Sequence, residues 1–126
     1  MGYTRYWDRT TKPIDQDFID AITRVIADSE KRGIEIRGGD GSGSPHLGLD
    51  FIAFNGNGDL RLDHETCYFG KETGFEFCKT ARKPYDYTVR QALKIAEQMG
   101  MVTDVSSDGP NDEIISDEDY LNRNKR

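Results

Sequence analysis

The chain has 126 residues, of which 35% are hydrophobic and 32% charged, and its formal net charge at pH 7 is −6. This length fits one hydrophobic core, and six Phe, six Tyr and one Trp supply enough bulky side chains to exclude disorder throughout the chain. The acidic balance argues against general duplex-DNA binding, and the sequence has neither the apolar run of a membrane span nor that of a signal peptide, so we expect a cytoplasmic protein.

The first part of the chain predicts a strand, a helix and a second strand. Residues 3–7 alternate around bulky β-formers, which is typical of a strand. Residues 15–32 carry apolar side chains at helical spacing with acids near the start, and Gly33 ends this helix. Residues 34–37 alternate again and predict a strand, which the glycine-rich residues 38–45 interrupt.

The middle of the chain predicts two hairpins. Residues 49–54 favour an apolar strand, and residues 55–58, Asn-Gly-Asn-Gly, favour a tight reversal. We expect residues 60–62 to pair back on that strand. Residues 65–69 and 75–79 predict a second hairpin around a glycine-containing turn, with aromatic side chains facing each other across it.

A second helix and a short edge strand follow. Asp86 is a suitable N-cap after Pro84, the apolar stripe of the helix ends at Gly100, and residues 101–103 favour a strand. Because most successive strands are joined by turns rather than by helices, the order predicts an α+β fold. We expect a single antiparallel or mixed sheet of about five to six strands with two helices packed on it.

The domain is expected to span residues 1–103, followed by an acidic flexible C-terminal tail of residues 104–126. This tail holds seven acidic and three basic residues and few bulky apolar ones, so it gains little from ordering. The alternative is a docking peptide that becomes helical on a partner and is built around Ile114, Ile115, Tyr120 and Leu121.

The glycine-rich segment after Arg37 is one candidate ligand site. It has five glycines among residues 38–48, beginning with Gly38 and Gly39, and its backbone N–H groups are able to curl around a phosphate. Arg37 and Asp40 at its base support that interpretation. It is neither a P-loop nor a dinucleotide-binding turn, because no Gly-Lys-Ser/Thr follows, and a mobile surface loop is the alternative.

The densest basic segment lies between the last hairpin strand and the second helix. Lys79, Arg82, Lys83 and Tyr85 stand at a strand-to-helix junction, where free N–H groups and the positive end of the helix dipole favour a phosphate. A solvated basic connector is the alternative.

The first strand carries a third candidate set, Arg5, Tyr6 and Trp7. These side chains combine a guanidinium with aromatic faces that stack on a base. Alternate residues point to opposite faces, so part of this set is expected in the core and part at the surface.

The two cysteines are too few for a disulfide scaffold and fit a reducing compartment. In the predicted hairpin Cys67 lies opposite Phe77, so Cys78 points to the other face, which disfavours both a disulfide and a shared metal. His64 and Cys67, with His46 elsewhere, give only a weak zinc signal. We therefore expect buried thiols, no metal and no other cofactor.

Several segments are similar to those of a group of small bacteriophage proteins whose sequences begin like Met-Gly-Tyr-Thr-His-Tyr-Trp. The similar segments are residues 1–7, 38–41, 54–56 and 77–86, the last reading Phe-Cys-Lys-Thr-Ala-Arg-Lys-Pro-Tyr-Asp. The resemblance covers roughly the first hundred residues, and Arg5 stands where that group has His. It implies a phage or prophage origin and action in a bacterial host cytoplasm, and it transfers no catalytic residue.

Three functions are compatible with these features. The leading hypothesis is non-catalytic binding of an anionic, nucleotide-like small molecule by the cations and rings named above, which in a phage setting serves to sequester a host immune signal. The second is an acidic protein-interaction module that occupies a basic site of a host protein. The third is a small phosphoester-processing enzyme using His46 or His64 with a nearby Asp. A homo-oligomer is left open.

Overall fold

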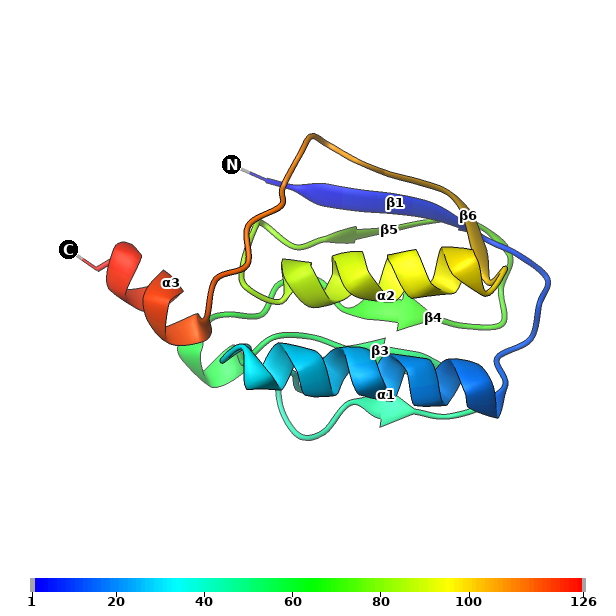
Figure 1. Ribbon diagram of the computed structural model, residues 1–126, viewed down its shortest axis with the longest axis horizontal. Coiled ribbons are helices and arrows are strands. Elements are labelled where there is room, and N and C mark those ends of the chain that lie inside the picture. The colour runs from blue at the N-terminus through cyan, green and yellow to red at the C-terminus, as the bar shows by residue number, and fades with distance from the viewer. Residues whose placement is uncertain (1, 126) are drawn as a thin grey trace.

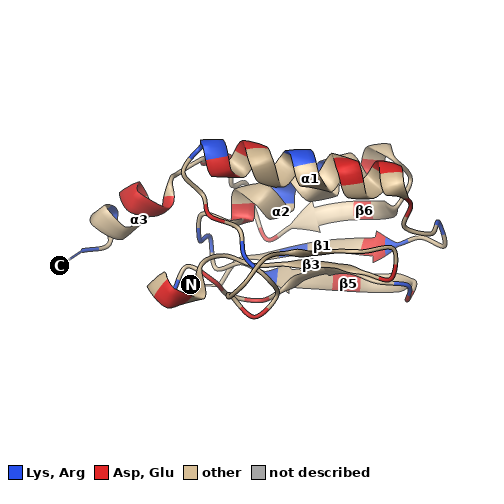
Figure 2. Cartoon of the chain, turned by 90° about the horizontal axis from the view of Figure 1, so that it is seen from below, with Lys and Arg blue, Asp and Glu red and all other residues tan. Residues whose placement is uncertain are grey.

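A computed structural model describes residues 2–125 and shows two layers, with two long helices covering one face of the strands (Figures 1 and 2). The elements in chain order are β1 (Thr4–Arg9), α1 (Gln16–Lys31), β2 (His46–Leu47), β3 (Ile52–Phe54), the 3₁₀ helix η1 (Gly58–Leu60), β4 (Cys67–Phe69), β5 (Gly74–Lys79), α2 (Asp86–Gln98), β6 (Val102–Ser107) and α3 (Asp117–Arg123). None of the described helices is long and apolar enough to cross a membrane.

The strands form two antiparallel sheets of three strands each, in the orders β5-β1-β6 and β2-β3-β4. The α+β class is therefore confirmed, whereas the prediction of a single sheet with two helices is wrong. The single sheet does not form because the predicted hairpin of residues 65–69 and 75–79 does not continue beyond its first pair. Only Glu65 and Lys79 meet in the expected register, through the Glu65 N–H and the Lys79 carbonyl at 3.0 Å, and then β4 pairs with β3 while β5 pairs with β1.

Two further predicted strands do not form. Residues 34–37 make only one isolated bridge, between Arg37 and Asn55. Residues 60–62 do not pair back on β3, because the side chain of Asn57 accepts a hydrogen bond from the Leu60 N–H and closes the 3₁₀ turn. Arg61 then takes a left-handed conformation with φ 59°, which turns the chain away from β3.

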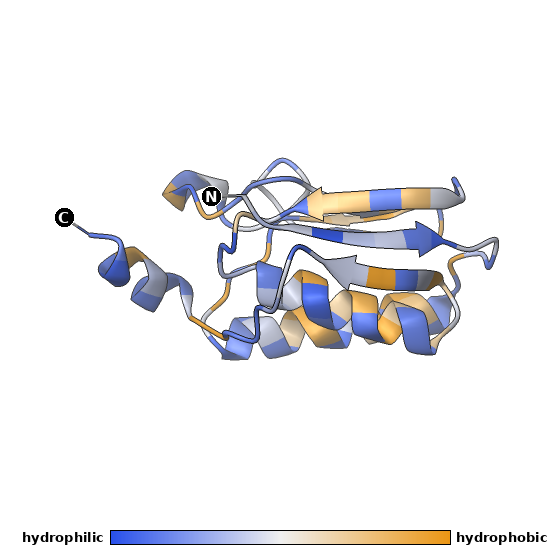
Figure 3. Ribbon diagram, turned by 90° about the horizontal axis from the view of Figure 1, so that it is seen from above, coloured by the Kyte–Doolittle hydropathy of each residue, from blue (hydrophilic) through white to orange (hydrophobic). Residues whose placement is uncertain are grey.

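The two long helices form close to where the sequence predicts them. Asp15 caps α1 by accepting the Phe18 N–H at 2.9 Å, and the helix ends at Lys31 just before Gly33, whose φ is 80°. The N-cap of α2 is Tyr85 instead of Asp86. Apolar residues alternate with hydrophilic ones along both helices (Figure 3), and the apolar ones join Trp7 and the strands in one core.

The residues after 103 take part in the fold. β6 runs to Ser107, so the predicted domain boundary falls inside a strand. Farther on, Ile115 is buried, and the Asp117 N–H donates to the Gly33 carbonyl at 2.9 Å, which attaches the start of α3 to the end of α1. That this segment is flexible in solution stays a prediction.

Candidate anion-binding site

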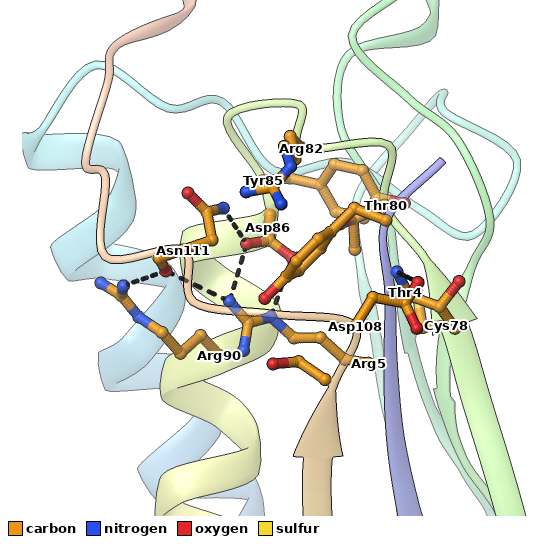
Figure 4. Close-up of polar contacts among 12 residues, drawn as sticks. Thr4, Arg5, Cys78, Thr80, Arg82, Tyr85, Asp86, Arg90, Asp108 and Asn111 are labelled. Atoms are coloured by element: carbon orange, nitrogen blue, oxygen red, sulfur yellow. Dashed lines mark hydrogen bonds and ion pairs between the residues drawn. The ribbon is translucent and has the colours of Figure 1, made fainter. Parts of the chain in front are cut away.

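The end of the sheet at which β1 begins and α2 starts holds a buried ion pair (Figure 4). Alternation along β1 turns Arg5 inward, and its Nε and Nη2 donate to the two carboxylate oxygens of Asp86 at 2.9 Å each. Arg5 is 7% exposed and Asp86 is 2% exposed. Burial alone lowers the pKa of Arg5, but the hydrogen bonds and the charge of Asp86 outweigh it and raise that pKa above its usual value.

Asp86 is also bonded by two neutral donors. The Thr80 hydroxyl donates to its Oδ1 at 2.6 Å, and the Asn111 amide donates to its Oδ2 at 2.6 Å. Both carboxylate oxygens therefore have two partners, as a buried carboxylate requires. The network joins β1, the connector before α2, α2 itself and the segment after β6.

Three arginines donate to two successive carbonyl groups of that last segment, and Figure 4 shows two of them, Arg5 and Arg90, meeting at the Asn111 carbonyl. The Asn111 carbonyl accepts from Arg90 Nη1 at 2.6 Å and from Arg5 Nη2 at 3.4 Å, and the Pro110 carbonyl accepts from Arg82 Nη1 at 3.3 Å. We call Arg5, Arg82 and Arg90 the arginine cluster. Its members come from β1, from the connector and from α2.

The cluster is only partly balanced by carboxylates. Arg5 has Asp86, and Arg90 has Asp112 at 3.6 Å, although the Asp112 side chain is 98% exposed. Arg82 has no carboxylate partner among residues 2–125. The guanidinium of Arg82 is thus the least compensated charge of the three.

A buried ring supports the cluster. The guanidinium carbon of Arg82 lies 4.1 Å from the centroid of the Tyr3 ring, and that of Arg5 lies 5.3 Å from it. Tyr3 is fully buried, and its hydroxyl donates to the Gly109 carbonyl. Cations are attracted to aromatic faces at this distance, so the Tyr3 ring helps to hold both guanidinium groups in place.

The backbone that presents Arg82 is strained. Ala81 and Arg82 both adopt left-handed conformations, with φ 55° and 56°, although neither is glycine. Such a conformation costs about 1–2 kcal/mol per residue. The turn is held by the Tyr3 carbonyl, which accepts the Thr80 N–H at 2.9 Å and the Ala81 N–H at 3.3 Å. Strain of this kind is concentrated at functional sites.

The other predicted cations lie in separate contacts. Lys83 donates to the carbonyls of Arg61 and Asp63 at 2.8 Å, and Lys79 lies over the Phe77 ring at 5.9 Å. Arg37 donates to Glu35 at 2.7 Å and to Asp59 at 2.9 Å. In the contacts described, Arg37 shares no partner with the arginine cluster.

The glycine-rich segment folds largely on itself. The Gly38 N–H donates to the Ser42 carbonyl, and a Cβ on Gly38 would lie 2.6 Å from that oxygen. The Gly39 carbonyl accepts from Asn55 and Thr66. Hydrogen bonds from Ser42 lower the pKa of Asp40. Some of the backbone groups that the sequence predicts as phosphate ligands are therefore hydrogen-bonded to other groups of the protein.

The aromatic residues of the predicted site divide between core and surface. Trp7 and Tyr85 are core residues, with 1% and 0% exposure, and the Tyr85 hydroxyl donates to the Glu65 carbonyl at 2.6 Å. Tyr6 faces the open side of the sheet, where it stacks against Phe75 with ring centroids 6.0 Å apart. Its hydroxyl donates to Asp108, which raises the pKa of Tyr6.

Sequence reasoning missed Arg90 and Asn111. Arg90 follows Asp86 by four residues, so the helical repeat places both on one face of α2, and this spacing was a usable signal. Asn111 lies within the predicted tail, and nothing local marks it. The sequence predicts Phe75 on a hairpin face opposite residues 65–69, whereas the residue lies exposed on the open face of the other sheet, opposite Asp8.

The two cysteines are neighbours in the core, contrary to the predicted register. Both are buried and free, and burial together with the adjacent Cys78 raises the pKa of Cys67 well above its usual value. The strands diverge after Glu65 and Lys79, which lets both thiols turn inward.

Among the residues considered for a metal or for catalysis, His46 lies 3.0 Å from Asp50 with both side chains about half exposed. The described part of the chain contains no group of three or more His, Cys, Asp or Glu suited to a metal ion.

No protein-family model matches the chain, and no curated protein or solved structure matches it either.

Proposed function

We propose that the protein is a non-catalytic binder of an anionic, nucleotide-like small molecule and that the arginine cluster holds the anion. The observation that carries this proposal is the convergence of Arg5, Arg82 and Arg90 on the carbonyls of Pro110 and Asn111. A guanidinium binds phosphate through two parallel N–H donors, which is stronger than its bond to a neutral carbonyl. A phosphate is therefore a better partner for Arg82 and Arg90 than the two carbonyls are, whereas Arg5, whose Nε and Nη2 already donate to Asp86, contributes its positive charge.

Arg82 is the member that first meets a ligand. It is exposed, its bond to Pro110 is long, and its backbone is strained into position over the Tyr3 ring. Tyr6, on the same strand, offers an aromatic surface for a base. Asp108 connects the two regions, because it accepts both from Tyr6 and from the Thr4 N–H beside Arg5.

The proposed biological role follows from the resemblance to small bacteriophage proteins. In an infected bacterium, a protein that binds a nucleotide without converting it removes that molecule from circulation. We propose sequestration of a host immune signal as this role.

Ligand-dependent thermal unfolding tests the binding. The wild-type protein is heated with and without a panel of ADP-ribose, cyclic dinucleotides and AMP, and the ligand is afterwards recovered for mass spectrometry. At a ligand concentration of about 100 times Kd the stabilisation is about 2.7 kcal/mol. Arg82→Ala is expected to abolish it, whereas Arg24→Ala, an exposed arginine on α1, leaves it unchanged.

Two results would refute the proposal. One is the absence of stabilisation by every member of the panel, and the other is equal stabilisation of wild type and Arg82→Ala. Recovery of chemically altered ligand would instead favour the phosphoester-processing alternative.

A further inference from the structure

A second surface lies farther along the C-terminal segment, at α3. A groove of about 540 Å³ opens between the end of α1, η1 and α3. It is lined by Glu30, Gly33, Glu35, Leu60, Asp117, Glu118 and Leu121. We call it the acidic groove, because these seven residues include four carboxylates and no cation.

The wall formed by α3 is fixed in place by short-range contacts. The Asp117 N–H donates to the Gly33 carbonyl, and the Glu35 N–H donates to the Asp117 carboxylate, both at 2.9 Å. Gly33 has φ 80°, and a Cβ there would lie 2.9 Å from the Cβ of Ser116. This close approach joins α3 to the end of α1, so the groove is a built feature of the fold.

The groove combines apolar area with uncompensated negative charge. Leu60 is 48% exposed and Leu121 is 37% exposed. Within residues 2–125, Glu30 and Glu118 have no ion-pair partner. Figure 2 shows acidic residues in the first turn of α3, and acidic residues together with the basic Lys31 at the end of α1 beside it.

We propose that the acidic groove docks a basic amphipathic segment of another protein. Lysine or arginine side chains of that segment pair with Glu30 and Glu118, and its aliphatic side chains cover Leu60 and Leu121. A second copy of this chain is a poor occupant because each copy carries a net charge of −6, and a nucleic acid would meet like charge. The proposal is independent of the arginine cluster, because the two surfaces share no residue.

The test uses a fluorescent model peptide of about five helical turns with Leu and Lys at amphipathic spacing, titrated with the full chain in an anisotropy assay. Two control peptides replace either every Leu by Ser or every Lys by Glu. The Leu/Lys peptide is expected to bind and both controls to bind about tenfold more weakly or worse, because the groove needs both charge and apolar contact.

Variants locate the binding on the chain. Leu60→Ser with Leu121→Ser, and separately Glu30→Gln with Glu118→Gln, are expected to weaken binding by about tenfold. The matched controls are Leu49→Ser, which is 61% exposed outside the groove, and Glu72→Gln in the exposed β4–β5 loop.

Thermal unfolding of each variant separates lost binding from lost fold, and the exposed Glu-to-Gln pair keeps the test decisive if the leucine pair unfolds. The proposal is overturned if the Ser-substituted peptide binds as tightly as the Leu/Lys peptide, because attraction is then general. It is equally overturned if groove and control variants lose the same affinity, if no peptide binds, or if a concentration series shows the groove occupied by a second copy.

Discussion

Replacement of Asp86 by Ala removes the carboxylate that balances a buried guanidinium. Arg5 is 7% exposed and loses both of its 2.9 Å hydrogen bonds, while Thr80 and Asn111 each lose an acceptor. Breaking a buried ion pair in this way costs about 3–5 kcal/mol, because the remaining charge stays desolvated. Four lost hydrogen bonds place the expected value toward the upper end of that range.

Urea unfolding followed by tryptophan fluorescence measures this loss. The single tryptophan, Trp7, is 1% exposed in the core and reports on global unfolding. Native domains have unfolding free energies of about 5–15 kcal/mol, so Asp86→Ala removes a large share of the stability. With a slope of about 1.5 kcal/mol per molar urea, a loss toward the upper end of about 3–5 kcal/mol lowers the midpoint by about 3 M.

A double replacement tests the physical reason. Arg5→Met combined with Asp86→Leu removes both charges and is expected to restore most of the stability, because paired apolar residues replace a buried ion pair at little cost. Glu113→Ala breaks the exposed pair with Arg123 and is expected to cost no more than about 1 kcal/mol. A loss below about 1 kcal/mol for Asp86→Ala would refute the assignment of a desolvated, tightly paired Arg5.

Three further predictions concern other parts of the fold. Cys67 and Cys78 are expected to react with a disulfide reagent at pH 8 far more slowly in the folded than in the urea-unfolded protein, because both are buried and the pKa of Cys67 is raised. Tyr87→Phe is expected to raise the pKa of Asp28, measured by carboxyl NMR, because the Tyr87 hydroxyl at 2.7 Å is the main cause of its lowering. Because the pKa of Asp28 is lowered in the folded protein, its ionised carboxylate stabilises the fold at pH values above the pKa of Asp28 in the unfolded chain. This stabilisation is lost as the pH falls through the pKa of Asp28 in the folded protein, so the stability of the variant is expected to depend less on pH in this acidic range. Gly33→Ala is expected to cost about 1–2 kcal/mol in urea unfolding, since φ is 80° and the added Cβ meets a neighbour at 2.9 Å.

Each of these three predictions has an outcome that would contradict it. Equal thiol reaction rates in the two states would contradict burial of the cysteines. An unchanged Asp28 pKa in the tyrosine variant would assign its lowering to Arg32 instead. Gly109→Ala, where a Cβ meets nothing within 4 Å, is the control for Gly33→Ala, and an equal effect of the two would argue against the close approach to Ser116.

Local patterns account for the elements that the sequence predicts well. α1 needs only a capping Asp15, an apolar stripe and a glycine at its end, and all three are near neighbours in the chain. The alternation of β1 likewise indicates that Arg5 and Trp7 share one face and Tyr6 takes the other. The predicted hairpin of residues 65–79 shows where local patterns fail. Both of its segments form strands, but each strand pairs with a partner from elsewhere in the chain, and local spacing does not indicate that partner.

The sequence by itself determined the α+β class, the two long helices and the acidic balance of the chain, since each follows from composition or from spacing over a few turns. Only the tertiary structure decided the split into two sheets, the meeting of the cysteines and the formation of the arginine cluster. Arg5 and Asp86 are 81 positions apart, and Asn111 lies in a segment whose composition predicts no order. Contacts of that range depend on how the layers pack, which no local periodicity encodes.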